Sequence, residues 1–133
     1  MEQDPPIERI LFVDDEDALV ELLTGSLAQL GYRVAGFASG ELALEAFRSA
    51  PHDFDAVISD LSMPGMSGLD LARCILGIRP GTPIVLTSGC VQAEDEAAAK
   101  ELGILGFAEK GYSIVEIARS LDRILRGEAA QER

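Results

Sequence analysis

Residues 56–68 read Ala-Val-Ile-Ser-Asp-Leu-Ser-Met-Pro-Gly-Met-Ser-Gly. The stretch begins with a short, largely apolar run that is typical of a buried strand, and this run stops at Asp60. A loop rich in proline and glycine follows, which marks the end of the strand. In an open parallel α/β sheet, ligands bind beyond the carboxyl ends of the strands. This placement makes Asp60 the first candidate for the chemistry of the protein.

Short apolar runs and segments of helical periodicity alternate along the whole chain. The expected strands are 9–13, 33–37, 56–59, 82–86 and 106–109. The expected helices begin near residues 18, 39, 69, 94 and 113, and the first four end at Gly31, Pro51, Gly77 and Gly103. This alternation predicts an α/β fold, a single doubly wound (βα)5 domain whose parallel five-stranded sheet has helices on both faces. The default strand order is 2-1-3-4-5, that of the flavodoxin-like fold.

The spacing of apolar residues predicts which face each helix buries. In the first helix the expected face consists of Leu19, Leu22, Leu23, Leu27 and Leu30. In the second helix, which we expect Ser39 to cap, it consists of Leu42, Ala43, Ala46 and Phe47. The helix at 94–102 has few large apolar residues, so we expect it to be more exposed than the others.

Length and composition fit one folded domain of 133 residues, of which 47% are hydrophobic. We predict a flexible lead-in at 1–8, the domain at 9–126 and a polar tail at 127–133. The net charge of −12 repels phosphate backbones and anionic lipids, so we expect no direct nucleic-acid partner and no membrane partner. We find no signal peptide and no apolar stretch near the ~18 residues of a membrane span, which predicts a cytoplasmic protein.

Cysteine and histidine offer little chemistry in this chain. Cys74 and Cys90 lack the spacing of a metal-binding or redox motif, so we expect free, reduced thiols. The single histidine, His52, follows Pro51 in a predicted loop and is interpreted as a solvated surface residue. One histidine does not build a typical zinc site.

Polar residues follow the predicted strands at the edge where their carboxyl ends meet. They are Asp14 and Asp15 after the first strand, Asp60 after the third, Thr87 and Ser88 after the fourth, and Lys110 after the fifth. The first and third strands are neighbours in the expected order, so Asp14, Asp15 and Asp60 should crowd together and repel one another. A hard divalent cation such as Mg²⁺ would relieve this repulsion, because it prefers oxygen ligands and binds a few carboxylates together with a phosphate.

The same edge suits a phosphoryl group on Asp60. Carboxylates are known nucleophiles in phosphoryl transfer, and positioning with electrostatic stabilisation supplies most of such catalysis. Lys110 would add a positive charge there and Thr87 a hydroxyl donor. Each residue alone has an ordinary explanation, such as a helix cap for Asp14 and Asp15 or a turn for Asp60. Their joint arrival at one edge is what favours a phosphoacceptor site.

These motifs are similar to those of the receiver domains of bacterial two-component response regulators. The resemblance runs over roughly residues 8–126 and rests on Phe-Val-Asp-Asp-Glu-Asp at 12–17, Asp-Leu-Ser-Met-Pro-Gly-Met-Ser-Gly at 60–68, Leu-Thr-Ser-Gly at 86–89 and Phe-Ala-Glu-Lys at 107–110. It implies that Asp60 accepts a phosphoryl group from a histidine kinase or histidine phosphotransfer protein in a reaction that needs Mg²⁺ or Mn²⁺. The protein would then switch conformation and signal an output partner.

The resemblance also implies roles for individual residues. The implied metal ligands are Asp15, the Asp60 carboxylate and the Ser62 backbone carbonyl, with Asp14 acting mostly through water. Thr87 would follow the phosphoryl group inward, and Phe107 matches the switch aromatic of the family. A homodimer through the fourth helix, fifth strand and fifth helix is a further implication.

One position departs from the pattern of the family. Receiver domains usually place proline directly after the lysine, often in a cis peptide bond, whereas Gly111 follows Lys110 here. Glycine does not hold that geometry. We therefore expect the loop between the fifth strand and the last helix to be freer or differently shaped, and the output surface to differ with it.

Three other functions stay open on the sequence alone. The domain is equally compatible with the receiver module of a hybrid sensor histidine kinase, whose kinase activity would belong to the larger protein. Phosphatases that form an aspartyl phosphate typically need a second aspartate two positions after the nucleophile, where this chain has Ser62. We therefore expect no turnover enzyme, only phosphorylation and dephosphorylation of the domain itself. A pseudo-receiver that only binds a partner is disfavoured by the complete acidic set.

Overall fold

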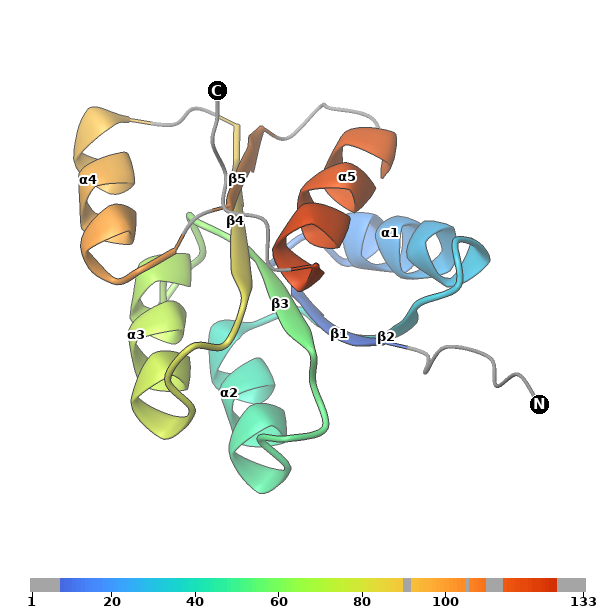
Figure 1. Ribbon diagram of the computed structural model, residues 1–133, viewed down its shortest axis with the longest axis horizontal. Coiled ribbons are helices and arrows are strands. Elements are labelled where there is room, and N and C mark those ends of the chain that lie inside the picture. Colours follow the sequence, from blue (N-terminus) through green and yellow to red (C-terminus); the bar gives the residue numbers. More distant parts are fainter. Residues whose placement is uncertain (1–7, 90–91, 105, 110–113, 127–133) are drawn as a thin grey trace.

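The computed structural model describes residues 8–89, 92–104, 106–109 and 114–126. Within these residues a parallel sheet of order β2-β1-β3-β4-β5 forms the centre of the molecule (Figure 1). Its strands are β1 (Arg9–Val13), β2 (Arg33–Phe37), β3 (Ala56–Asp60), β4 (Ile84–Ser88) and β5 (Gly106–Glu109). The helices are α1 (Asp17–Gln29), α2 (Gly40–Ser49), α3 (Gly68–Ile78), α4 (Ala93–Glu101) and α5 (Ile114–Leu125). The predicted fold class and strand order are confirmed.

Helices cover both faces of the sheet and bury alternate strand residues. One core cluster joins α2, α3 and part of α4 to strand residues that include Leu11 and Val57. The other joins α1 and α5 to strand residues that include Phe12 and Ile58. In Figure 1, α1 and α5 lie on one side of the sheet and α2 and α3 on the other. Because this double cover buries both faces, the strands read as nearly continuous apolar runs in the sequence.

The buried face of α1 differs from the prediction. Leu27 is fully buried and Leu23 packs against the core, but Leu22 is 63% exposed and Leu30 is 54% exposed. Leu30 is the C-cap rather than part of the helix. Val20 joins Leu23 and Leu27 in the cluster between α1 and α5. The face that packs on the sheet therefore lies beside the one that the leucine spacing suggests.

The next two helices follow the prediction more closely. In α2, Leu44 is buried with Phe47, whereas Leu42, which was expected inside, is 55% exposed. The hydroxyl of Ser39 accepts a hydrogen bond from the Leu42 amide at 3.1 Å, as predicted for the cap. Helix α3 begins slightly earlier than expected, because Ser67 caps it in a box closed by the Asp70 side chain.

The remaining predictions on the fold concern exposure and the ends of the chain. Within α4, Ala99 is the one buried residue, so the expected exposure of this helix is confirmed. His52 is exposed and Cys74 is a half-buried free thiol, whereas Cys90 lies outside the described residues. The predicted lead-in, apart from Glu8, and the predicted tail also lie outside them. No helix in the described part of the chain is long and apolar enough to cross a membrane.

Candidate functional site

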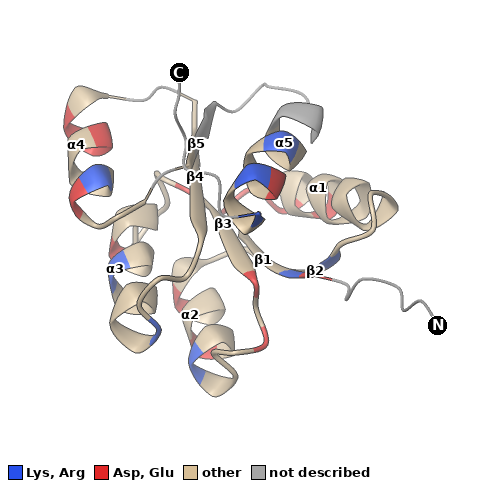
Figure 2. Cartoon of the chain, in the orientation of Figure 1, with Lys and Arg blue, Asp and Glu red and all other residues tan. Residues whose placement is uncertain are grey.

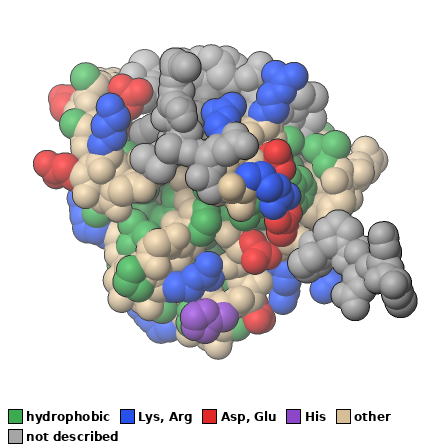
Figure 3. Space-filling view, viewed as in Figure 1, with side chains coloured by type: hydrophobic (Ala, Val, Ile, Leu, Met, Phe, Trp, Pro, Cys, Tyr) green, Lys and Arg blue, Asp and Glu red, His purple; other side chains and the backbone are tan. Residues whose placement is uncertain are grey.

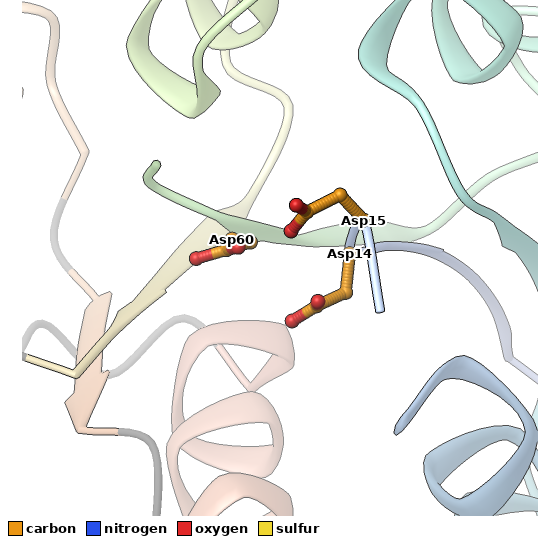
Figure 4. Close-up of side chains that lie close together, drawn as sticks. All are labelled: Asp14, Asp15 and Asp60. Carbon is orange, nitrogen blue, oxygen red and sulfur yellow. The ribbon is translucent and has the colours of Figure 1, made fainter. Parts of the chain in front are cut away.

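Three carboxylates meet at the carboxyl end of the sheet (Figure 4). Asp14 and Asp15 directly follow β1, and Asp60 ends β3, which pairs with β1 in parallel. One carboxylate oxygen from each residue lies within 4.8 Å of the other two. Asp14 and Asp60 are buried, at 0% and 3% exposure, whereas Asp15 is exposed. The prediction that these residues crowd together is confirmed.

Local hydrogen bonds position the two buried carboxylates. Asp14 Oδ1 accepts from the Glu16 amide at 2.9 Å, in an Asx turn that leads into α1. The Asp14 amide donates to the Phe37 carbonyl at 3.1 Å, which extends the β1–β2 pairing one residue past the strand. Asp60 Oδ1 accepts from the Ser62 amide at 3.4 Å. Both side chains are therefore tied to the backbone that immediately follows their strands.

Thr87 lies beside Asp60 on the neighbouring strand. The two residues are register partners in the parallel β3–β4 pair, and the Leu61 amide donates to the Thr87 carbonyl at 2.8 Å. Register partners in parallel strands point to the same face of the sheet. Thr87 is also buried, at 4% exposure. Its hydroxyl therefore belongs to the same edge as the Asp60 carboxylate.

The loop after β3 folds back onto the end of that strand, and Gly68 makes this possible. The Gly68 amide donates to the Leu61 carbonyl at 2.8 Å. A Cβ atom at position 68 would overlap the Asp60 carbonyl oxygen and lie 2.9 Å from Leu61 Cα. Gly65 in the same loop has φ +77, a conformation that favours glycine. The proline- and glycine-rich composition of the loop thus brings its backbone against that of Asp60.

The acidic cluster fits a hard divalent cation. Full charges about 4.8 Å apart repel by about 3.5 kcal/mol at an effective dielectric constant of about 20. This value applies to the buried pair Asp14 and Asp60, whereas solvent screens the repulsion of the exposed Asp15 to about 1 kcal/mol or less. A cation would offset this repulsion. The three donors are all carboxylate oxygens, which suit Mg²⁺ and Mn²⁺ better than softer metals. The composition of the cluster therefore supports the predicted type of metal.

The other predicted site residues lie at or beyond the limit of the described residues. Phe107 is the register partner of Leu86 in the β4–β5 pair. The side chain of Phe107 lies outside what the structure describes, and so do Lys110 and Gly111. The expected roles of Phe107 and Lys110, and the expected effect of Gly111 on its loop, stay predictions.

Comparison with known protein families identifies the family of this chain. The family model of the response regulator receiver domain matches residues 10–122. The chain belongs to this family. The receiver domain is 30% identical over 127 residues to the transcriptional regulatory protein QseB of Escherichia coli O157:H7. It is 35% identical over 122 residues to the DNA-binding response regulator MtrA of Mycolicibacterium smegmatis.

These alignments cover most of the receiver domain but only part of each relative. They include 93% and 91% of this chain, against 57% of QseB and 52% of MtrA. The chain therefore spans about half the length of the curated relatives it matches. The matches are response regulators of two-component signalling rather than turnover enzymes.

Solved structures agree on the fold. The chemotaxis protein CheY4 of Vibrio cholerae superposes with a TM-score of 0.83 at 26% identity, covering 90% of this chain and 99% of that one. FixJ-N superposes with a TM-score of 0.80 at 26% identity, covering 98% of this chain and 100% of that one. The predicted flavodoxin-like receiver fold is therefore confirmed.

The expectation of no direct nucleic-acid partner is wrong. The relatives that match most of this chain include a DNA-binding response regulator and a transcriptional regulatory protein. The expectation came from the net charge of −12. That charge describes the surface of the receiver domain and carries no information on the part of such proteins that contacts DNA.

Proposed function

We propose that this receiver domain accepts a phosphoryl group on Asp60 from a phosphorylated histidine of a partner protein and thereby changes conformation. The observation that supports this most directly is the acidic cluster, in which Asp14, Asp15 and Asp60 bring carboxylate oxygens within 4.8 Å of one another. Structural needs alone do not favour such a gathering of like charges. Phosphoryl transfer that depends on a divalent cation does need it.

Asp60 is the nucleophile in this proposal. One Oδ attacks the phosphorus, the new O–P bond forms as the P–N bond to the donor breaks, and the electron pair of that bond stays on the imidazole nitrogen. The contact between Asp60 Oδ1 and the Ser62 amide fixes the orientation of the carboxylate. Asp60 is buried, at 3% exposure, which limits its contact with bulk water.

The neighbouring residues have supporting roles. When bound, Mg²⁺ or Mn²⁺ would neutralise charge on the phosphoryl oxygens, held by Asp15, Asp60 and the Ser62 carbonyl, with Asp14 acting through water. Thr87 is proposed as a hydroxyl donor to the phosphoryl group, which its register position beside Asp60 supports. The roles of Lys110 as a counter-charge and of Phe107 as the switch aromatic rest on the family resemblance.

We propose that the conformational change regulates DNA binding and thereby transcription. Both MtrA and QseB, which the receiver domain matches over about half their length, carry names that describe DNA binding or transcriptional regulation. In such proteins a conformational change in one domain alters the activity of another by shifting a two-state equilibrium.

The phosphoacceptor is tested by mass spectrometry of the full chain after incubation with phosphoramidate and Mg²⁺. We expect a gain of about 80 Da, the mass of one phosphoryl group, and we expect Asp60→Asn to abolish it. Asp55→Asn is the matched control, because Asp55 precedes the same strand at the opposite end of the sheet and should leave the gain intact. A wild-type chain that shows no gain, or an Asp60→Asn chain that keeps it, contradicts the proposal.

A further inference from the structure

A groove lies between the loop after β3 and the start of α4. Its volume is about 540 Å³, and it is shallow and widely open to solvent. The described residues that line it are Leu61, Ser62, Met63, Pro64, Ser67, Leu69 and Asp95. Thus one wall comes from residues of the loop and of the start of α3, between positions 61 and 69, and the facing wall carries an acidic residue of α4.

The described lining of the groove combines apolar side chains with a single acidic residue, Asp95, which forms its acidic rim. Leu61 and Met63 are buried, at 5% and 8% exposure, and the lining contains no lysine or arginine among the described residues. Asp95 lies between Glu94 and Glu96, and all three are in the first turn of α4, where Figure 2 shows acidic residues. A ligand that fits must therefore offer an apolar group and a positive charge close together.

We propose that this groove is a docking site for a segment of a partner protein that presents a basic side chain next to an apolar one. The volume of about 540 Å³ lies within the range of about 300–1,000 Å³ that is typical of ligand sites, so the groove has room for two neighbouring side chains. Protein partners usually anchor a few side chains in such pockets, and a positive charge would be drawn to a domain with a net charge of −12.

Charge also disfavours a second copy of this chain as the occupant. Two copies would bring together surfaces that each carry a large excess of negative charge. A bound metal is disfavoured because Asp95 is the one carboxylate among the described lining residues. The docking site goes beyond the proposed phosphoryl transfer and does not depend on it, although Ser62 belongs to both the groove and the surroundings of Asp60.

The test uses two capped hexapeptides, Ac-Gly-Leu-Arg-Leu-Arg-Gly-NH₂ and its twin with glutamate in place of arginine, added to the ¹⁵N-labelled full chain. We expect the arginine peptide to shift the backbone amides of Met63, Leu69 and Asp95, and the glutamate twin to leave them unchanged. Equal shifts from both peptides, or no shift of these amides, would overturn the proposal. Shifts of the same amides that depend on protein concentration without peptide would assign the groove to a second copy and overturn it as well.

Two variants test the acidic and the apolar part of the groove separately. Asp95→Asn should weaken binding of the arginine peptide by up to about fivefold, the effect of one partly exposed ion pair. Leu69→Ser should weaken it further by removing part of the apolar wall. Glu101→Gln removes one charge from the last turn of the same helix, away from the groove, and should leave the affinity unchanged. An Asp95→Asn chain that folds and binds as wild type contradicts the assigned role of the acidic rim.

Discussion

The two ends of the sheet differ in how their charged side chains are arranged. At the carboxyl end, Asp14, Asp15 and Asp60 bring like charges within 4.8 Å of one another. At the amino end, the Arg9 guanidinium lies 3.4 Å from the Asp53 carboxylate and packs over the ring of Phe54. One end therefore gathers charges of one sign, whereas the other pairs opposite charges and adds a ring contact.

The pairing at the amino end extends to the last helix. Arg126 donates to the Glu8 carboxylate at 2.9 Å and lies 3.2 Å from the Asp122 carboxylate. Figure 3 shows basic and acidic side chains side by side on this face of the molecule. We infer that the ion pairs at the amino end stabilise the fold, whereas the repulsion among the three carboxylates at the carboxyl end lowers its stability. One substitution at each end tests how much the local contacts there contribute to stability. A third tests the difference in charge directly, and a fourth tests how the amino end responds to pH.

The largest effect is expected from Gly68→Ala at the carboxyl end. The added methyl group would overlap the Asp60 carbonyl oxygen and come within 2.9 Å of Leu61 Cα, so backbone must move. We expect the free energy of unfolding in urea to fall by about 3 kcal/mol and phosphorylation to slow. Gly77→Ala is the control, because a Cβ there meets nothing within 4 Å. It should stabilise α3 by about 0.5–1 kcal/mol. Equal stability of the two variants would mean that the loop does not need glycine at position 68.

A smaller loss is expected from Arg79→Met at the amino end. Arg79 Nη1 donates to the carbonyls of Pro51 and Phe54, each at 2.6 Å, and so ties the end of α3 to the loop before β3. Removing it leaves both carbonyls without this charged donor, which should cost about 2 kcal/mol in urea denaturation. Arg73→Met removes only an exposed contact with Asp70 at 3.5 Å and should change stability by less than about 0.5 kcal/mol. Matching losses for the two variants would refute the role given to Arg79.

Without divalent cations, removing one negative charge should change the stability of the protein in opposite directions at the two ends of the sheet. Without divalent cations, Asp15→Asn should raise the midpoint of thermal unfolding, because it removes one of three like charges. The gain should be about 1 kcal/mol or less, since Asp15 is exposed. With Mg²⁺ the order should reverse, because wild type gains more stability from binding. Asp53→Asn should lower stability slightly under both conditions, since it breaks the pair with Arg9. If Asp15→Asn destabilises the cation-free protein, the two ends do not differ as proposed.

The sheet and the acidic cluster were predictable because they depend on local features and on strand order. An apolar run of about five residues identifies a buried strand, and parallel winding brings the carboxyl ends together. Asp14, Asp15 and Asp60 therefore met as expected without any knowledge of side-chain packing. Gly68 was part of the quoted stretch, but its close approach to the Asp60 backbone is a contact across the loop that no spacing rule reveals.

The packing of α1 was less predictable because leucines occur around much of its surface. The surface of the sheet determines which face of α1 packs inward. A Cβ atom at Gly36 in β2 would lie 2.6 Å from Val20 Cγ1. Because Gly36 has no side chain, α1 can approach the sheet with Val20 facing inward. Leu22 is then left 63% exposed. Helical periodicity alone does not contain this information, since it describes one element and not the surface on which that element packs.

The smallest predicted effect is an alkaline one at Tyr32, near the charge cluster of the amino end. Burial raises the pKa of Tyr32 above its ordinary value of 10.0, and the charges of Asp122 and Glu8 raise it further, while Arg126 lowers it. The unfolded chain therefore releases the tyrosine proton before the folded protein does. The stabilising contribution is complete below about pH 10 and is lost as the pH rises toward the folded pKa. Urea denaturation between about pH 8 and 11 should show wild type losing stability faster than Tyr32→Phe above about pH 10, with a constant difference below it. Parallel curves over the whole range would show that neither burial nor the neighbouring charges raise the pKa of Tyr32.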